Sequence, residues 1–269
     1  MNRKLVLIIS DGGNGANHLK GVHIDENNYL NFFKSPEGGA WMDHEILVYD
    51  QNNFDVDVLH AIDLGARAEN NPIVYYLIVF CGHGYTDELG RIHLEVRMDC
   101  DLLLENLQAA VARSRYLIIA DSCRAVVRLN EGGQVNTLRM FSTSEDARRS
   151  AYATLCRNWY NAQLERTPRN MHMVLFSNSF DETAEEDSRK GGYYSYALMQ
   201  SAKVKIEETH RLQENHAASC SYSVDDIHQL AAKNVVAKTY DTQHPDILEN
   251  SRSMKRFPFV VVPHWQMQL

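Results

Sequence analysis

The chain has 269 residues, of which 44% are hydrophobic and 23% charged, a balance typical of a globular protein. The 27 basic and 35 acidic residues give a net charge of -8, which argues against a protein that binds nucleic acid through a basic face. An acidic surface instead attracts cationic substrates. The five cysteines are an odd number without a CxxC pair, which argues against a disulfide framework or a structural zinc site.

No segment of the sequence has the character of a membrane anchor. The apolar run Leu5–Ile9 is too short for the core of a signal peptide, and no stretch approaches the roughly 20 apolar residues of a membrane span. Together with the cysteine content, this predicts a soluble cytoplasmic protein without membrane or nucleic-acid partners.

In the first half of the chain, apolar strands alternate with amphipathic helices. The elements predicted there are a strand at Leu5–Ile9, a helix at Asp25–Phe33, strands at Glu45–Tyr49 and Val74–Phe80, a helix at Cys100–Ala112 and a strand at Tyr116–Ala120. The strands are near-continuous runs of aliphatic and aromatic residues, which is typical of strands buried on both faces.

The second half begins with an irregular segment, Val126–Phe141, that is predicted to be a long surface loop. After it we predict a helix opened by a capping box at Ser142 and Glu145, a strand at Met173–Ser177, a helix starting at Ser223 and a strand at Phe257–Val262. The whole pattern predicts an α/β protein with a largely parallel sheet covered by helices on both faces. No linker or repeat divides the chain, so we expect a single domain over residues 1–269.

Two predicted strands end in residues of catalytic type. The strand that ends at Phe80 runs into Cys81-Gly82-His83-Gly84, and the strand that ends at Ala120 runs into Asp121-Ser122-Cys123-Arg124. The segment between them has the length of a crossover connection, so the two strands can be parallel neighbours. Their carboxyl ends then meet at the sheet edge where ligands bind in open α/β sheets. We therefore expect His83 to face Cys123.

A cysteine beside a histidine is typical of nucleophilic catalysis. A thiol attacks a carbonyl as the thiolate, and a nearby imidazole both lowers the thiol pKa and protonates the leaving amine. Gly82 and Gly84 leave the backbone bare for a substrate, and the amides of Gly84 and Cys123 are candidate oxyanion donors. A lone histidine or cysteine at a strand end is usually structural, but the pair at neighbouring strand ends favours catalysis. A thiol–metal site is the weaker alternative, because only Cys81 adds a sulfur ligand nearby.

Three further segments, Gly21–Tyr29, Phe176–Ser195 and Arg256–Phe259, accompany these two motifs in an order and at a spacing that resemble a known family. With them the chain resembles the caspase-like cysteine peptidases, and metacaspases and bacterial caspase homologues more than animal caspases. The sequence departs from the pattern of the family in small ways. Ala125 and Val126 stand where many metacaspases have Ser-Gly, and Phe180 stands where a cysteine or proline is frequent.

The resemblance implies a three-layer caspase-haemoglobinase fold with a six-stranded, mostly parallel sheet, and hydrolysis of peptide bonds by a Cys-His dyad. His83 would be the general base and acid, and Cys123 the nucleophile. Asp121 would lie at the base of the S1 pocket and favour Arg over Lys at P1, because a carboxylate pairs with a guanidinium in a bidentate fork. Asp181 is the candidate second acid of the pocket and Glu182 a further one.

The resemblance also divides the domain into a large-subunit-like part (about 1–125), an exposed loop (126–141) and a small-subunit-like part (142–269). Within the loop, Arg128 and Arg139 are the candidate sites of self-cleavage. Bacterial relatives often serve in defence or cell-death modules. Many metacaspases are activated by calcium, but the chain carries no EF-hand-like series of ligands, so we expect no required cofactor. Regulation would then come from a partner protein, an ion or the chain's own loops.

Other functional classes remain open at the level of the sequence. The main alternative is a catalytically silent caspase-like scaffold or binding module. An acyltransferase or thioesterase would fit the dyad but not the acidic pocket residues. The loop Asp11–Gly15 lacks the spacing of a phosphate-binding loop, and the remaining histidines lack metal-ligand spacing, so no metal site is predicted.

Overall fold

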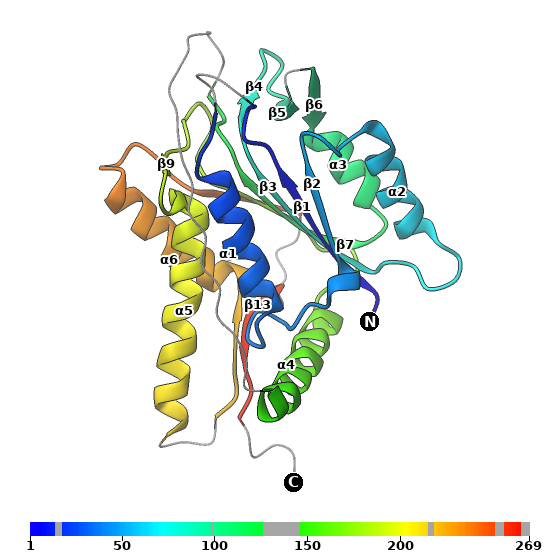
Figure 1. Cartoon of the computed structure of the whole chain (residues 1–269), viewed down its shortest axis with the longest axis vertical. Coiled ribbons are helices and arrows are strands. Elements are labelled where there is room, and N and C mark those ends of the chain that lie inside the picture. The colour runs from blue at the N-terminus through cyan, green and yellow to red at the C-terminus, as the bar shows by residue number, and fades with distance from the viewer. Residues whose placement is uncertain (14–17, 98, 126–145, 215–217, 251–255, 265–269) are drawn as a thin grey trace.

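The computed structural model describes residues 1–13, 18–97, 99–125, 146–214, 218–250 and 256–264. Its centre is a six-stranded sheet in the order β12-β8-β7-β3-β1-β2, with helices on both faces (Figure 1). The strands are β1 (Arg3–Ile9), β2 (Ile46–Asp50), β3 (Tyr75–Cys81), β7 (Arg115–Asp121), β8 (His172–Phe176) and β12 (Asp246–Glu249). All neighbours are parallel except β12, which runs antiparallel to β8. The predicted mostly parallel sheet of six strands is confirmed.

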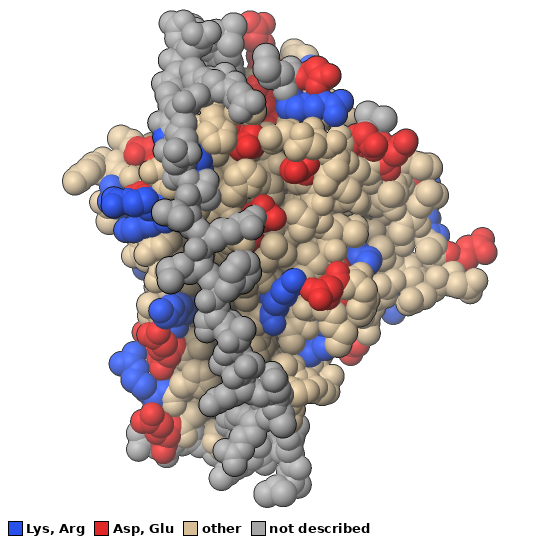
Figure 2. Space-filling model, in the orientation of Figure 1, with Lys and Arg blue, Asp and Glu red and all other residues tan. Residues whose placement is uncertain are grey.

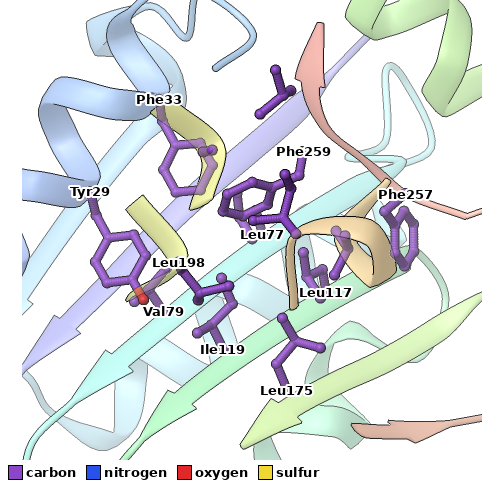
Figure 3. Close-up of a cluster of buried hydrophobic side chains, with 14 of the residues drawn as sticks. Tyr29, Phe33, Leu77, Val79, Leu117, Ile119, Leu175, Leu198, Phe257 and Phe259 are labelled. Carbon is purple, nitrogen blue, oxygen red and sulfur yellow. The ribbon is translucent and has the colours of Figure 1, made fainter. Parts of the chain in front are cut away.

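One face of the sheet is covered by four helices and an extra strand. They are α1 (Val22–Lys34), α4 (Asp146–Arg166), α5 (Tyr193–Gln213), α6 (Val224–Lys238) and β13 (Pro258–Val262). Figure 3 shows this core, in which Tyr29 and Phe33 of α1 lie over Leu77 and Val79 of β3, and Phe259 lies close by. Apolar residues at alternate strand positions build this layer.

The opposite face carries α2 (Val56–Arg67) and α3 (Leu104–Val111), together with a small antiparallel sheet. That sheet consists of β4 (Gly84–Thr86), β5 (Ile92–Arg97) and β6 (Cys100–Leu103). Val6 and Ile8, which alternate with the β1 residues of the first core, pack into this second core. Because β1 and β3 are covered on both faces, nearly all their residues are apolar and buried.

Several elements differ from the sequence-based expectation. The predicted helix Cys100–Ala112 is in fact strand β6 followed by the shorter helix α3, because Leu102 packs into the core from a hairpin. The last apolar strand, β13, does not join the central sheet but pairs with β11 (Cys220–Ser223). The sixth strand of the central sheet is β12, which the sequence analysis missed because its residues are half-buried or exposed.

Several short elements complete the description. They are the 3-10 helix η1 (Asp43–Glu45) and the two-residue strands β9 (Glu186–Asp187) and β10 (Gly191–Gly192). The predicted helix start at Ser223 is confirmed, since the Asp226 amide donates to the Ser223 hydroxyl at 3.2 Å. The capping box at Ser142 lies outside the described residues, as does the predicted loop.

The strand order creates a switch point on the sheet. From β1 the chain moves to β2 on one side, and then to β3, β7 and β8 on the other side. In open α/β sheets, a crevice suited to ligands forms beyond the carboxyl ends of the strands at such a point. The segments that follow β1, β3 and β7 therefore meet at this edge.

A buried ion group connects β1 to the helical layer. The Arg3 Nε donates to Glu45 Oε1 at 3.3 Å, and Arg157 of α4 donates to the same carboxylate at 2.6 and 2.7 Å. The Arg3 guanidinium also lies 4.1 Å from the ring centroid of Trp41. Burial alone would raise the pKa of Glu45, but the hydrogen bonds from Arg157 and the charge of Arg3 lower it to about 2.

Replacing Glu45 by glutamine is expected to lower the free energy of unfolding at pH 7 by about 2 kcal/mol, because charged hydrogen bonds become neutral ones. The folded pKa of Glu45 lies below its unfolded value of 4.5, so the stabilisation is complete above pH 4.5 and is lost as the pH falls towards 2. Urea unfolding at pH 7 and pH 3 should show a smaller difference at pH 3. The exposed Glu105→Gln is the control, and equal differences at both pH values would contradict this account.

Candidate active site at the carboxyl edge of the sheet

His83 and Cys123 follow neighbouring parallel strands at the same level. Cys81 of β3 is in register with Asp121 of β7, and each candidate catalytic residue lies two positions beyond its strand's paired residue. The Gly82 amide donates to the Asp121 carbonyl at 3.2 Å, which joins the two segments beyond the last paired residues. Both candidate side chains are half-buried. The backbone thus brings the two motifs together, while their catalytic roles stay predictions.

The two glycines beside His83 allow neighbouring segments of the chain to pack closely against the main chain. A Cβ atom on Gly82 would lie 2.9 Å from the Ser10 side chain, and one on Gly84 would lie 2.8 Å from the Ser122 hydroxyl. The space beside both glycines is therefore occupied by the ends of β1 and β7. This differs from the sequence-based idea that the bare backbone makes room for a substrate.

The turn that carries Cys123 is fixed on both sides by the segment after β8. The Ser122 amide donates to the Ser177 hydroxyl at 3.2 Å, and the Arg124 amide donates to the Glu182 carbonyl at 3.0 Å. A nucleophile on a turn held in this way needs little reorganisation before it attacks, which lowers the entropic part of the barrier.

The Cys123 thiol lies under the main chain of the same loop. Its Sγ accepts a hydrogen bond from the Ala184 amide at 3.3 Å. Burial raises the pKa of Cys123, and the charges of Asp121 and Glu95 act in the same direction, against the lowering effect of the Ala184 amide. The surroundings of Cys123 therefore disfavour the thiolate in this state.

Glu95 of β5 is a site residue that the sequence analysis missed. Its amide donates to the His83 carbonyl at 3.0 Å. Burial raises the pKa of Glu95 while the charge of His83 lowers it, so the carboxylate is within electrostatic range of the imidazole. No sequence motif marks Glu95, and nothing in the local pattern shows that its strand β5 passes the main chain of His83.

A pair of buried carboxyl groups, Asp25 of α1 and Asp121 of β7, lies close to the His83 and Cys123 motifs, with only 2% and 7% of their surfaces exposed. Asp121 accepts from the Ser195 amide at 3.1 Å, and Asp25 accepts from the Gly192 amide at 2.8 Å. Both carboxylates thus lie at the N-terminal end of α5, where backbone donors favour negative charge.

In the described part of the chain, no basic side chain pairs with either of the two carboxyl groups. Burial raises the pKa of Asp25, and the charge of Asp121 raises it further. Burial also raises the pKa of Asp121, although hydrogen bonds from Ser195 oppose this. Within the described ranges, neither acid forms an ion pair, and Asp25 Oδ1 is buried without a hydrogen-bond partner. This arrangement is complementary to a cationic group of a ligand.

The sequence matches the family described as the caspase domain over residues 3–257. The chain belongs to the caspase-domain family. Its fold is similar to that of caspase-1 from Spodoptera frugiperda, with a TM-score of 0.55, 11% identity and coverage of 92% of this chain and 86% of that one. A protein from Geobacter sulfurreducens is similar with a TM-score of 0.57, 14% identity and coverage of 97% and 100%, respectively. The comparison with curated proteins found no match.

The family confirms the resemblance and supports a cysteine peptidase function in general terms. The solved structures, at these low identities, support the fold alone. The catalytic residues of this caspase domain and its substrate are therefore proposed from the geometry of the site.

The other two candidate pocket acids lie on the loop after β8. The Glu182 carboxylate accepts from the Ser179 amide at 3.0 Å and is 2.7 Å from His244 Nδ1. Burial would raise the pKa of Glu182, but the hydrogen bonds from His244 and Ser179 lower it. Asp181 is exposed with a φ of 63°, and its amide donates to the Arg124 carbonyl at 3.3 Å. Glu182 is thus engaged by His244, and the substrate-binding roles of Asp181 and Glu182 stay predictions.

Asp25 was not assigned a role from the sequence, although the segment Gly21–Tyr29 was among those that resemble the family. By its local pattern, Asp25 is an acidic residue in a predicted amphipathic helix, and such a residue is usually exposed. Its burial follows from the packing of α1 against α5, where the Gly192 amide meets the Asp25 carboxylate.

Replacing Asp25 by asparagine is expected to raise the melting temperature by a few degrees at pH 8, because it removes an uncompensated buried charge while the amide oxygen still accepts from Gly192. A carboxyl with a raised folded pKa destabilises the protein above its unfolded pKa, so the gain should disappear as the pH falls below that value. The melting temperatures of the wild type and the variant at pH 8 and pH 4 measure this gain. A lower melting temperature of Asp25→Asn than of the wild type at pH 8 would contradict the presence of an uncompensated buried charge.

The remaining expectations concern metals, membranes and processing. Among the described residues, no three His, Cys, Asp or Glu side chains are grouped so that they could hold a metal ion. None of the described helices has the length and apolar character needed to cross a membrane. The candidate self-cleavage sites Arg128 and Arg139 lie outside the described residues.

Proposed function

We propose that this caspase-family protein is a cysteine endopeptidase that cleaves peptide bonds after Arg and, less well, after Lys. The observation that carries the proposal is the buried pair Asp25 and Asp121, which has no basic partner in the described part of the chain and lies at the sheet edge that holds His83 and Cys123. A P1 guanidinium would supply the positive charge that this pair lacks.

In the proposed mechanism, His83 takes the proton from the Cys123 thiol, and the thiolate attacks the carbonyl carbon of the P1 residue. The amides of Gly84 and Cys123 are the proposed donors to the resulting oxyanion. His83 then protonates the leaving amine, which leaves an acyl group on Cys123. A water molecule, deprotonated by His83, hydrolyses this thioester and restores the free enzyme.

Charge complementarity is the proposed source of P1 specificity. A guanidinium can donate two directed hydrogen bonds to a carboxylate, whereas a lysine ammonium interacts as a point charge, so Arg should exceed Lys. A P1 Asp would add a third negative charge to the pair and be rejected. In Figure 2, Asp and Glu side chains are more prominent than Lys and Arg near the top, around the end of the molecule where β4–β6 lie in Figure 1. Such a surface should attract basic peptides.

The alternative is a catalytically silent scaffold, which the raised pKa of Cys123 and its contact with Ala184 would also suit. A peptidyl thiol-reactive inhibitor with Arg at P1 separates the two. We expect a covalent adduct on Cys123 with the Arg reagent, and none with the matched Asp reagent or with Cys123→Ala. Absence of the adduct, while iodoacetamide still modifies Cys123 in the same preparation, would favour the scaffold.

We also propose a cytoplasmic location, a regulatory protein partner and a role in a defence or cell-death pathway. These parts of the proposal rest on composition and family resemblance. A regulated peptidase of this kind needs a trigger that changes the activity of the dyad. Calcium is one such trigger to test, by comparing peptide cleavage with and without it.

Self-cleavage, if it accompanies this specificity, is expected at Arg128 or Arg139. A loop rich in glycine and polar residues is accessible to a protease, and both sites present Arg at P1. Incubated wild-type protein should then lose its intact mass and yield fragments that end at one of these residues, while Cys123→Ala stays intact. An unchanged wild-type mass in a preparation that cleaves peptides would remove processing from the mechanism.

A further inference from the structure

A cavity of about 650 Å³ lies at the opposite edge of the sheet, by the amino ends of β1, β3 and β7. Figure 1 shows this edge near the N-terminus, away from the strands β4–β6 that flank the dyad. Its size falls within the range of about 300–1,000 Å³ that is common for small-molecule sites. Neither the dyad nor the acidic pair contributes to its walls.

The walls of this cavity are rich in arginine. Arg113, Arg115 and Arg169 line it, and Glu165 is the single acidic side chain among its lining residues. Arg113 and Arg169 are exposed, whereas Arg115 is only 8% exposed and donates from Nε to the Thr167 carbonyl at 3.0 Å. No ion pair involving these three arginines occurs within the described ranges.

Two observations indicate that the described residues do not neutralise this positive charge. Burial and the neighbouring charge of Arg169 lower the pKa of Arg115, and Glu165 offsets this only in part. The side chains that line the cavity also carry three positive charges against one negative charge. Guanidinium groups that line the same cavity are suited to phosphate, which they bind through bidentate hydrogen bonds.

Another part of the wall is apolar. Ala66 at the end of α2, together with Pro72, Ile73 and Val74 before β3, lines the cavity beside the arginines. Such a surface can pack against a flat ring. The cavity thus combines an apolar side with a cationic side, which is the pattern expected for an amphipathic anion rather than for a simple inorganic ion.

We propose that this cavity binds a nucleotide-sized anionic ligand, with its phosphate groups on Arg113, Arg115 and Arg169 and its ring against Pro72 and Ile73. The site is separate from the proposed peptidase centre and does not depend on it. The probes that test it are ADP, pyrophosphate and the uncharged adenosine, which separate the contribution of the phosphates from that of the ring.

Isothermal titration calorimetry of the full chain measures these three probes at low and high salt. We expect ADP to bind more tightly than pyrophosphate, adenosine to show no measurable binding, and the affinity for ADP to fall as salt is raised. No heat with ADP and pyrophosphate at millimolar concentration would overturn the proposal. Equal affinity for adenosine and ADP would overturn it as well.

Variants locate the binding within the molecule. Arg113→Gln and Arg169→Gln should each weaken ADP binding about tenfold, because each removes a charge-assisted contact. Both side chains are exposed, so the fold should be retained, and peptide cleavage should not change. Arg67→Gln, which removes a nearby arginine that does not line the cavity, should leave the affinity unchanged. Unaltered affinity in the double variant Arg113→Gln with Arg169→Gln would contradict this site.

Discussion

Replacing Cys123 by alanine is expected to reduce peptidase activity by about 10⁴-fold or more, because a methyl group cannot form the acyl intermediate. The fold should persist. The Cys123 side chain is small and half-buried, and its sulfur accepts a hydrogen bond from the Ala184 amide. The value of kcat/KM for a fluorogenic peptide with Arg at P1 measures the loss, and the melting temperature checks the fold.

The matched control for this variant is Cys220→Ala. Cys220 is also half-buried, but it lies in β11, which pairs with β13 rather than with the central sheet. Its replacement should leave kcat/KM unchanged. His83→Ala should lose activity nearly as strongly as Cys123→Ala. Activity retained by Cys123→Ala would show that the nucleophile is another residue.

Replacing Asp121 by asparagine is expected to lower kcat/KM for Arg substrates by about 10²–10³-fold, because removing one partner of a buried charge pair costs roughly 2–5 kcal/mol. The amide oxygen of asparagine can still accept from the Ser195 amide, so the start of α5 should stay in place. The negative charge of Asp121 raises the pKa of Cys123, and its loss should therefore leave alkylation of Cys123 by iodoacetamide unchanged or faster.

These two readouts separate a role in substrate binding from a structural role. If Asp121 served only to fix the start of α5, its replacement would shift the backbone near Cys123, and peptide cleavage and alkylation would fall together. Asp181→Asn on the exposed loop is the comparison variant. A loss with Asp181→Asn as large as that with Asp121→Asn would make Asp181 the second acid of the pocket, in place of Asp25.

The fold was predictable from the sequence where a strand is covered on both faces. The runs that became β1, β3, β7 and β8 are almost wholly apolar, which leaves little choice of structure. The edge strand β12 was missed because Leu248 and Asp246 are exposed there and the hydrophobic signal is weak. The segment that starts at Cys100 has the pattern of a single helix, since four residues of a hairpin strand can continue an apolar helical stripe.

The site was predictable only where a residue directly follows a strand. His83, Cys123 and Asp121 lie at the ends of β3 and β7, and the parallel order of these strands brings them to one edge. Asp25 and Glu95 come from a helix face and from a hairpin. Their approach to the site depends on how α1 packs on α5 and how β5 passes His83, and neither contact leaves a local signal in the sequence.

The central claim is that a buried carboxylate pair beside a Cys-His dyad selects a basic P1 residue. A panel of fluorogenic peptides that differ only at P1, with Arg, Lys, Gln and Asp, tests it most directly when kcat/KM is measured for the wild type with Cys123→Ala as the blank. The account predicts the order Arg, Lys, then Gln, with Asp at the level of the blank. Cleavage after Asp, or equal cleavage after Arg and Gln, would contradict it.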